Sequence, residues 1–162
     1  FFIDKIYDMK NTPLSLVLIL SLLWAFTACK SSQATTEKPS TESPNLNNTS
    51  WTVTVMGIEN GRPAPVLAES QITLTFKDRG IAGNTGCNSY SSACEIKGNG
   101  MKVSEIMHTE AYCNDPKGIM NQEAQYLAFL KQAQSFEIQK DGSLRISCSG
   151  GNMILLTEAS GN

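Results

Sequence analysis

After residue 50 the chain alternates between hydrophobic and polar residues in short runs, which is the pattern of half-buried β-strands. Trp51, Val53 and Val55 alternate with threonines in the run WTVTV, so we expect these three side chains to share the buried face of one strand. The same alternation recurs at residues 71–77, 93–97, 101–106, 136–140, 143–147 and 153–157.

Short turn signals separate these runs. They are KDRG at residues 77–80, GNG at 98–100, Asp-Gly at 141–142 and SGGN at 149–152. Turns this short join antiparallel neighbours. We therefore expect a mainly β, α+β domain, in which an antiparallel meander is curled into a small barrel-like sheet.

One segment departs from the strand pattern. In residues 115–134 the apolar residues Met120, Ala124, Leu127 and Leu130 recur at helical spacing, and the Asp-Pro pair at 115–116 is a typical helix start. We expect one amphipathic helix that packs this apolar stripe on the sheet.

The N-terminus has the design of a secretory signal, predicted over residues 1–28. Translation is expected to start at Met9, which leaves residues 1–8 upstream of the true start. The sequence FTAC, ending at Cys29, resembles the lipobox of bacterial lipoproteins, in which the cysteine is diacylated. An ordinary cleaved signal with Cys29 incidental is the alternative. Lys30 follows, rather than the aspartate of inner-membrane lipoproteins, so the resemblance favours an outer-membrane location.

Residues 29–50 read as the lipidated cysteine and a disordered tether, because this stretch is rich in Ser, Thr, Pro and Asn. Residues 51–160 have the length of one domain. The chain is 41% hydrophobic and 17% charged, with a formal net charge of -2 and no basic patch. We therefore expect no nucleic-acid partner. We also expect a monomer that is held at the membrane by its lipid anchor.

The cysteines raise the question of chemistry. If Cys29 is lipidated, four cysteines remain for an oxidising compartment, and they allow three full pairings. A rival hypothesis makes Cys87 the nucleophile of an acyl-transfer enzyme, with His108 as its base. Neither C-x-x-C nor H-E-x-x-H spacing occurs, so no metal and no cofactor are expected.

The order of motifs carries a family resemblance. A Trp strand is followed by GNTGCNSY at residues 83–90, EIMHTEAYC at 105–113 and EAQYLAFL at 123–130. This arrangement resembles the META domain family, which includes HslJ-like heat-inducible bacterial lipoproteins. The resemblance implies an envelope location, an association with stress tolerance and no established catalysis.

The resemblance also assigns the cysteines. Cys87 and Cys113 stand at the family's motif positions, so it implies that these two form a disulfide. Cys94 and Cys148 lie outside the motifs, in predicted strands, and are expected to form a second disulfide. The motif GCN is then a structural turn, and no role passes to His108 from the family.

Two functional hypotheses follow. The first is a non-catalytic envelope lipoprotein that supports stress tolerance by binding or by structural support. The alternative is an inhibitor or ligand-binding module for a secreted enzyme or a small molecule, which needs an exposed projecting loop. Two loops qualify by sequence, residues 57–65 with Arg62 and residues 84–92 with Asn84, Asn88 and Tyr90. These four residues form the predicted binding surface.

Overall fold

The computed structural model describes residues 44–58 and 61–159. The predicted signal peptide, the start at Met9, the lipidated Cys29 and the tether up to residue 43 lie outside the described residues. Among the described residues, no helix combines the length and the apolar character that crossing a membrane requires.

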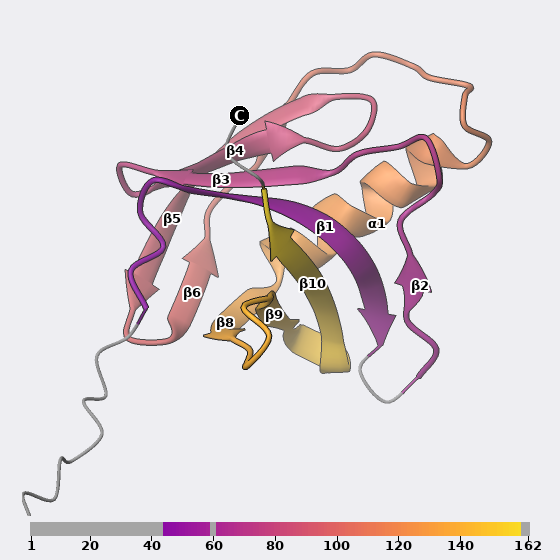
Figure 1. Ribbon diagram of the computed structural model, residues 1–162. Helices are drawn as coiled ribbons and strands as arrows, with labels where there is room; N and C mark the ends of the chain where they lie inside the picture. The colour runs from indigo at the N-terminus through magenta and orange to yellow at the C-terminus, as the bar shows by residue number, and fades with distance from the viewer. Residues whose placement is uncertain (1–43, 59–60, 160–162) are drawn as a thin grey trace, which may run out of the picture. The chain divides into compact units, whose positions relative to one another are not determined.

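The fold is a closed antiparallel barrel of eight strands with one helix, as the alternating runs and the short turns predict (Figure 1). The barrel order is β10, β9, β8, β6, β5, β4, β3 and β1, and pairing of β1 with β10 closes it. Two-residue strands extend it, β2 beside β1 and β7 beside β5. The elements are β1 (Thr49–Ile58), β2 (Ala64–Pro65), β3 (Thr73–Lys77), β4 (Gly80–Asn84), β5 (Ser89–Lys97), β6 (Gly100–Val103), β7 (Met107–His108), α1 (Ile119–Lys131), β8 (Ala133–Ile138), β9 (Leu144–Cys148), the short 3-10 turn η1 (Ser149–Gly151) and β10 (Asn152–Glu158).

The alternating pattern places the core correctly in β3 but not throughout β1. Leu74 and Phe76 of β3 are both buried. In β1, a register shift between Val53 and Val55 marks a β-bulge against β10. A bulge adds one residue to one strand and reverses which face the following side chains occupy. Met56 is therefore buried at 4% exposure, whereas Val55, predicted to be buried, is only half-buried.

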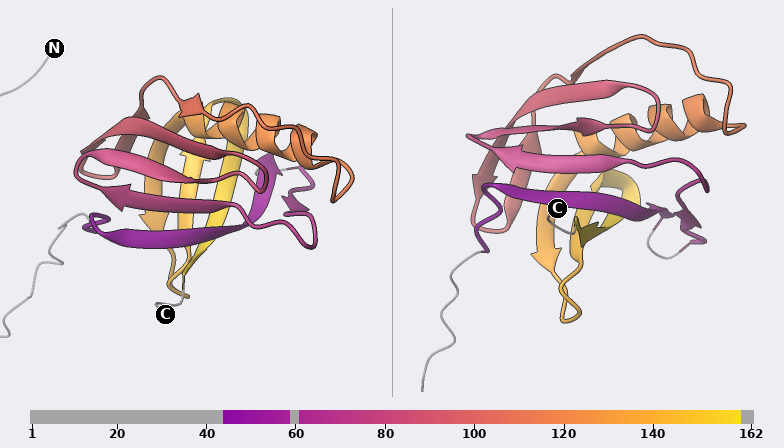
Figure 2. Two further views of the ribbon diagram at one scale, coloured as in Figure 1. Left: turned by 90° about the horizontal axis from the view of Figure 1, so that it is seen from above. Right: turned by 45° about the horizontal axis from the view of Figure 1, so that its top comes forward.

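The helix packs against two strands that are not neighbours in the barrel. Within the described residues β6 and β8 pair at a single position, Gly100 with Ser135, and α1 contacts both β6 and β10 (Figure 2). The predicted helix is present, but it begins at Ile119 rather than at residue 115, after Gly118 in the left-handed conformation (φ 95°).

The buried face of α1 differs from the predicted apolar stripe. Leu130 is buried, but Ala124 is exposed, and Met120 and Leu127 are half-buried. The helix is rotated so that it buries a mixed face, and its buried residues are Ile119, Gln122, Glu123, Tyr126 and Leu130. The reason lies in a polar cluster inside the domain, to which this face contributes.

The folded domain begins before residue 51, so the prediction of a disordered tether is wrong for residues 44–50. Leu46 is buried at 3% exposure, and β1 already begins at Thr49. The Asn48 amide donates to the carbonyl of Phe76 at 2.9 Å. Burial of Leu46, the one aliphatic side chain of this stretch, holds the segment on the end of the barrel.

Candidate functional site

The two family motifs meet in space. The loop at residues 85–88, between β4 and β5, faces residues 109–113, which follow β7. A disulfide joins Cys87 to Cys113, with an S–S distance of 2.00 Å and a Cα–Cα distance of 6.0 Å. This is the pairing that the resemblance implied, and it fastens two segments that are 26 residues apart.

Gly86 of the motif has a backbone that only glycine adopts easily. Its φ is 100°, and a Cβ at this position would lie 2.6 Å from the Ser70 hydroxyl oxygen. The Gly86 amide donates to the Asn84 side-chain oxygen at 2.7 Å. The left-handed conformation and the close approach of Ser70 both explain the glycine.

Asn88 is the centre of the arrangement, and it is 1% exposed. Its side-chain nitrogen donates to the Ala111 carbonyl at 3.0 Å and to Glu123 Oε1 at 2.9 Å. Its side-chain oxygen accepts from the Thr109 hydroxyl at 2.7 Å and from the Ala111 amide at 2.8 Å. Both amide hydrogens and both lone-pair positions of this side chain are thus used.

Glu123 supplies a buried carboxylate from α1 and is 5% exposed. Besides the Asn88 side chain, it accepts from the Asn88 backbone amide at 3.2 Å and from the Thr85 hydroxyl. Hydrogen bonds to a carboxylate compensate for its removal from water. We call Thr85, Asn88, Thr109 and Glu123 the polar cluster, and it joins the motif loop, the segment after β7 and the helix.

A pair of buried tyrosines extends the contact between α1 and the barrel. The Tyr90 hydroxyl donates to the Thr73 carbonyl at 2.9 Å, and the hydroxyls of Tyr90 and Tyr126 are 2.6 Å apart. The two rings pack edge to face, with centroids 5.6 Å apart. Burial raises the pKa of both phenols well above the ordinary value, so both stay protonated.

Two of the four residues predicted to form a binding surface are unavailable to a partner. Asn88 and Tyr90 are 1% and 4% exposed, because their polar atoms are bonded inside the domain. Asn84 is half-buried and accepts the Gly86 amide. Arg62 is exposed in the other predicted loop, of which residues 59 and 60 lie outside the described part. The predicted surface is therefore wrong at Asn88 and Tyr90.

The second predicted disulfide does not form. Cys94 and Cys148 are free, buried thiols. Cys94 lies on β5 and Cys148 on β9, and β6 and β8 stand between these strands in the barrel. Burial raises the pKa of Cys94 to about 11 and that of Cys148 to about 12, so both thiols are unreactive at neutral pH.

The Cys-His hypothesis loses its nucleophile in this structure. The Cys87 sulfur is bonded to Cys113, and a disulfide sulfur carries no thiolate to attack a substrate. His108 lies exposed on β7, with its Nδ1 2.9 Å from the Thr109 carbonyl. Across residues 44–58 and 61–159, no three His, Cys, Asp or Glu side chains are grouped to hold a metal ion.

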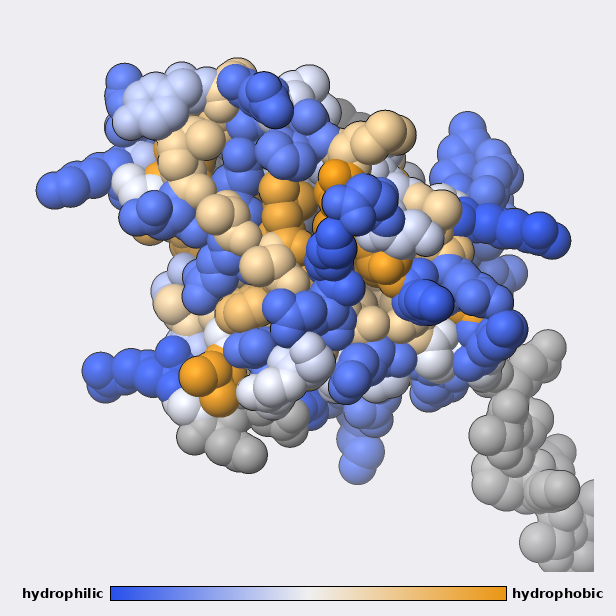
Figure 3. Space-filling model, turned by 180° about the vertical axis from the view of Figure 1, so that it is seen from behind, coloured by the Kyte–Doolittle hydropathy of each residue, from blue (hydrophilic) through white to orange (hydrophobic). Residues whose placement is uncertain are grey.

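The surface has several open hollows of similar volume and scattered apolar side chains, and one hollow adjoins the first described residue. The hollow has a volume of about 600 Å³ and lies at the end of the barrel where residue 44 begins. Its apolar walls include Leu46 and Phe76, each 3% exposed, and the exposed Asp78 and Arg79 stand beside them. On the face seen from behind, apolar side chains gather toward the middle but are broken up by polar ones (Figure 3).

Sequence reasoning missed Glu123 and Thr85 as members of the site. A signal for Glu123 existed, because it shares helical spacing with Ile119, Tyr126 and Leu130, which all become buried. A carboxylate in the middle of an apolar helical stripe indicates a buried polar contact. Thr85 carried no such signal, since a threonine beside a glycine is ordinary in a turn.

Comparison with known proteins agrees with this architecture. The family model described as META domain matches residues 44–161. No curated protein sequence matches the chain significantly. A protein from Burkholderia xenovorans, solved by NMR, is 20% identical with a TM-score of 0.62, over 72% of this chain and 85% of that one. A crystal structure of a DUF4847 family protein from Bacteroides vulgatus is 11% identical with a TM-score of 0.53, over 72% and 96% of the two chains. At these identities the structures show a shared fold.

Proposed function

The chain belongs to the META domain family. From this premise we propose that the protein is a non-catalytic, lipid-anchored protein of the cell envelope, with the outer membrane as its favoured location. Its role is to support stress tolerance by binding or by structural support. The family contains HslJ-like proteins, which is the general context of this proposal.

The proposal is supported by the bonds that the side chains of the motif make inside the domain. Cys87 is bonded to Cys113, and each hydrogen-bonding position of the Asn88 side chain is occupied. Glu123, the buried carboxylate beside them, accepts from groups of the same cluster. These side chains are already bonded to one another and hold three segments together. None of them is left to bind or attack a substrate, which favours a structural role for the motif.

The experiment is complementation of a deletion strain of the native host under heat and detergent stress. The wild-type gene and the His108→Ala variant are expected to restore survival equally, because His108 is exposed and outside the polar cluster. The Cys29→Ser variant is expected to fail, since it lacks the anchor. Loss of rescue with His108→Ala while the protein accumulates normally would count against a non-catalytic role, and full rescue by Cys29→Ser would count against the anchor.

A further inference from the structure

The disulfide of the domain does not join cysteines that are neighbours in the sequence. The cysteines after residue 50 are Cys87, Cys94, Cys113 and Cys148. The disulfide joins the first of them to the third, which are 26 residues apart. Cys94 stands only seven residues after Cys87 and remains a free thiol. The cysteine closest to Cys87 in sequence is therefore not its partner in the folded domain.

In the unfolded chain, Cys87 meets Cys94 more often than it meets Cys113. The probability that the two ends of a flexible loop meet falls with about the 3/2 power of the loop length. A loop of seven residues therefore closes about sevenfold more often than one of 26 residues. The order of synthesis acts in the same direction, because Cys87 and Cys94 emerge before Cys113. Oxidation before folding thus favours a bond between Cys87 and Cys94.

The folded domain excludes this bond. Cys94 lies five residues beyond Ser89, the first residue of β5, and this length of strand spans about 16 Å. The two steps from Cys87 to Ser89 cover at most about 7 Å. The Cα atoms of Cys87 and Cys94 thus stay at least about 9 Å apart, and a disulfide tolerates about 7 Å. A bond between them would prevent formation of β5, which pairs with β4, β6 and β7.

Folding instead brings Cys113 to Cys87. Asn88, next to Cys87, holds the amide and the carbonyl of Ala111 at 2.8 and 3.0 Å. The Cys87 sulfur lies 3.6 Å from the same carbonyl oxygen. These hydrogen bonds do not require the disulfide, so they can place the segment that carries Cys113 beside Cys87 before the two sulfurs are joined.

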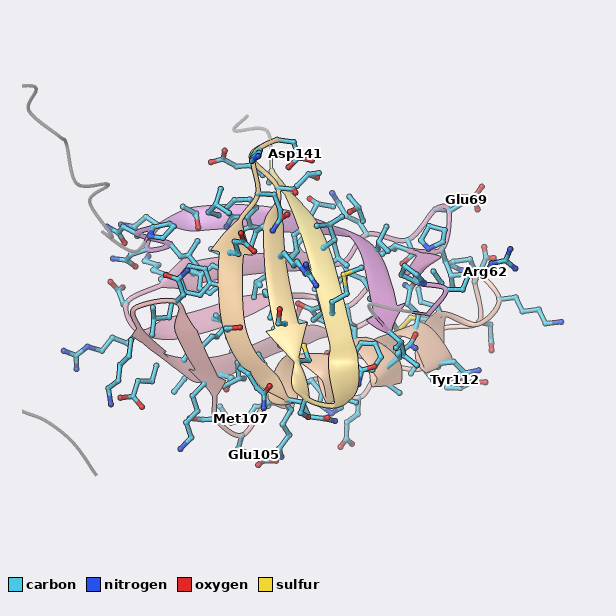
Figure 4. All side chains as sticks on the ribbon, turned by 90° about the horizontal axis from the view of Figure 1, so that it is seen from below. Arg62, Glu69, Glu105, Met107, Tyr112 and Asp141 are labelled. Atoms are coloured by element: carbon cyan, nitrogen blue, oxygen red, sulfur yellow. A yellow bond between two sulfur atoms is a disulfide. The ribbon has the colours of Figure 1, made fainter. Side chains whose placement is uncertain are left out.

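The strand β5 leads Cys94 away from this place. Seen from below, Tyr112, the neighbour of Cys113, and Met107 lie in different parts of the domain (Figure 4). Met107 pairs with Ser91 of β5, and Cys94 lies three residues further along the strand. In the folded domain Cys94 is 5% exposed, and burial raises its pKa to about 11. Its thiol therefore does not attack the finished disulfide.

We propose that Cys94 is a transient partner of Cys87 during folding, and that Cys113 then displaces it. In the first reaction the thiols of Cys87 and Cys94 lose two protons and two electrons, which reduce an external disulfide compound to two thiols. In the second, the Cys113 thiolate attacks the Cys87 sulfur, and Cys94 leaves as a thiolate that takes up a proton. The second reaction needs no oxidant, because one disulfide replaces another. This inference rests on the proposed function only for the oxidising compartment.

The first step of the test identifies the disulfides that form during refolding. The mature chain with Cys29→Ser, reduced and unfolded in urea, is diluted into a buffer of reduced and oxidised glutathione. Free thiols are blocked with N-ethylmaleimide at intervals before digestion. Trypsin leaves Cys87 and Cys94 on one peptide, residues 80–97, and Cys113 on another, residues 103–117.

Early samples should contain the peptide 80–97 with an internal disulfide, in several-fold excess over the crosslinked pair of peptides. This species should then decay as the crosslinked pair accumulates. Formation of the crosslinked pair from the start, without the internal disulfide, would overturn the proposal.

The second step compares two variants. Cys94→Ala removes the transient partner, and Cys148→Ala is a matched control, since both thiols are 5% exposed. The native disulfide should form at least about threefold faster in Cys94→Ala than in Cys148→Ala, because the competing loop is absent. Equal rates would overturn the proposal, and if either variant fails to fold, the trapped species of the first step decide. Both steps use purified protein, so a failure here leaves the complementation result standing on its own.

Discussion

The polar cluster makes a sharp prediction for Asn88→Asp, a substitution that preserves shape. The change replaces the side-chain nitrogen by an oxygen. That nitrogen donates to the Ala111 carbonyl at 3.0 Å and to Glu123 Oε1 at 2.9 Å, so two acceptors lose their donor and meet an oxygen instead. The new carboxylate also lies beside the carboxylate of Glu123 in a buried site, where repulsion is strong.

The expected loss of stability follows from these contacts. Each buried acceptor left without its donor costs about 1–3 kcal/mol, so two of them cost about 2–6 kcal/mol before charge repulsion is added. A domain of this size has a total free energy of unfolding of about 5–15 kcal/mol. Asn88→Asp should therefore remove a large part of the stability, or leave the domain unfolded at 37 °C if the total lies at the low end.

Asn84, the last residue of β4, offers a matched control beside the same loop. Its side-chain oxygen accepts from the Gly86 amide at 2.7 Å, and an aspartate keeps that acceptor. Urea unfolding followed by fluorescence of the buried Trp51 should show a loss below about 1 kcal/mol for Asn84→Asp. Equal losses for Asn84→Asp and Asn88→Asp would refute the reasoning.

A double-mutant cycle tests the contact between Asn88 and Glu123 itself. Glu123→Gln in the Asn88→Asp background places an amide donor opposite the aspartate oxygen and removes one of the two charges. We expect the pair to be more stable than the sum of the single changes by about 1 kcal/mol or more. Additive losses would mean that the two side chains do not interact as described.

Three further predictions concern the cysteines. Replacing Cys87 and Cys113 together by serine should lower the free energy of unfolding by about 3–4 kcal/mol in urea titrations, as expected for a disulfide that closes a loop of this size. An unchanged free energy of unfolding would contradict a stabilising role of the disulfide. Burial raises the pKa of Cys94 and Cys148 from 9.0 to about 11 and about 12, so above about pH 9 the unfolded chain releases protons that the folded domain retains. Stability should then fall as the pH rises from 9.0 toward 12, and a urea midpoint that stays constant or rises over this interval would be inconsistent with buried thiols. Intact-mass analysis should find a mature chain that begins at Cys29 and carries acyl chains, whereas an unacylated mass would refute the anchor.

The strand pattern predicted the barrel because side chains of a strand that covers a core alternate with period two. It holds in β3, where Leu74 and Phe76 are buried as expected. The alternation fails after Val53, because the bulge depends on the pairing of β1 with β10, more than 90 residues later in the chain. There Val53 pairs with Leu156 and Val55 pairs with Leu155. Local alternation contains no information about such a distant partner.

The helix shows a different limit. The predicted stripe counted only apolar residues, so it included Ala124 and left out Glu123. The orientation of α1 follows instead from hydrogen bonds that Glu123 makes to Thr85 and Asn88 on a loop between two strands. A buried carboxylate becomes recognisable as such only when its donors from other segments are known.

The prediction that the GCN motif forms a turn is correct, whereas the prediction that Asn88 and Tyr90 belong to a binding surface is wrong. The disulfide between Cys87 and Cys113 followed from the family positions, and the structure contains it. The side chains of Asn88 and Tyr90 point into the domain, because the segment after β7 and the helix supply partners for their polar atoms. Polar and aromatic residues in a predicted turn do not reveal on which side these partners lie.

The central claim is that Cys87 of the motif stabilises the fold through its disulfide and is not a nucleophile. The most direct test is alkylation of the mature protein with iodoacetamide, followed by peptide mapping. Without reductant, the native domain should show no alkylation of Cys87, Cys94, Cys113 or Cys148. After unfolding in urea, still without reductant, Cys94 and Cys148 should be alkylated and the other two should remain joined. Rapid alkylation of Cys87 in the native protein, suppressed by His108→Ala, would contradict the claim and support the acyl-transfer hypothesis instead.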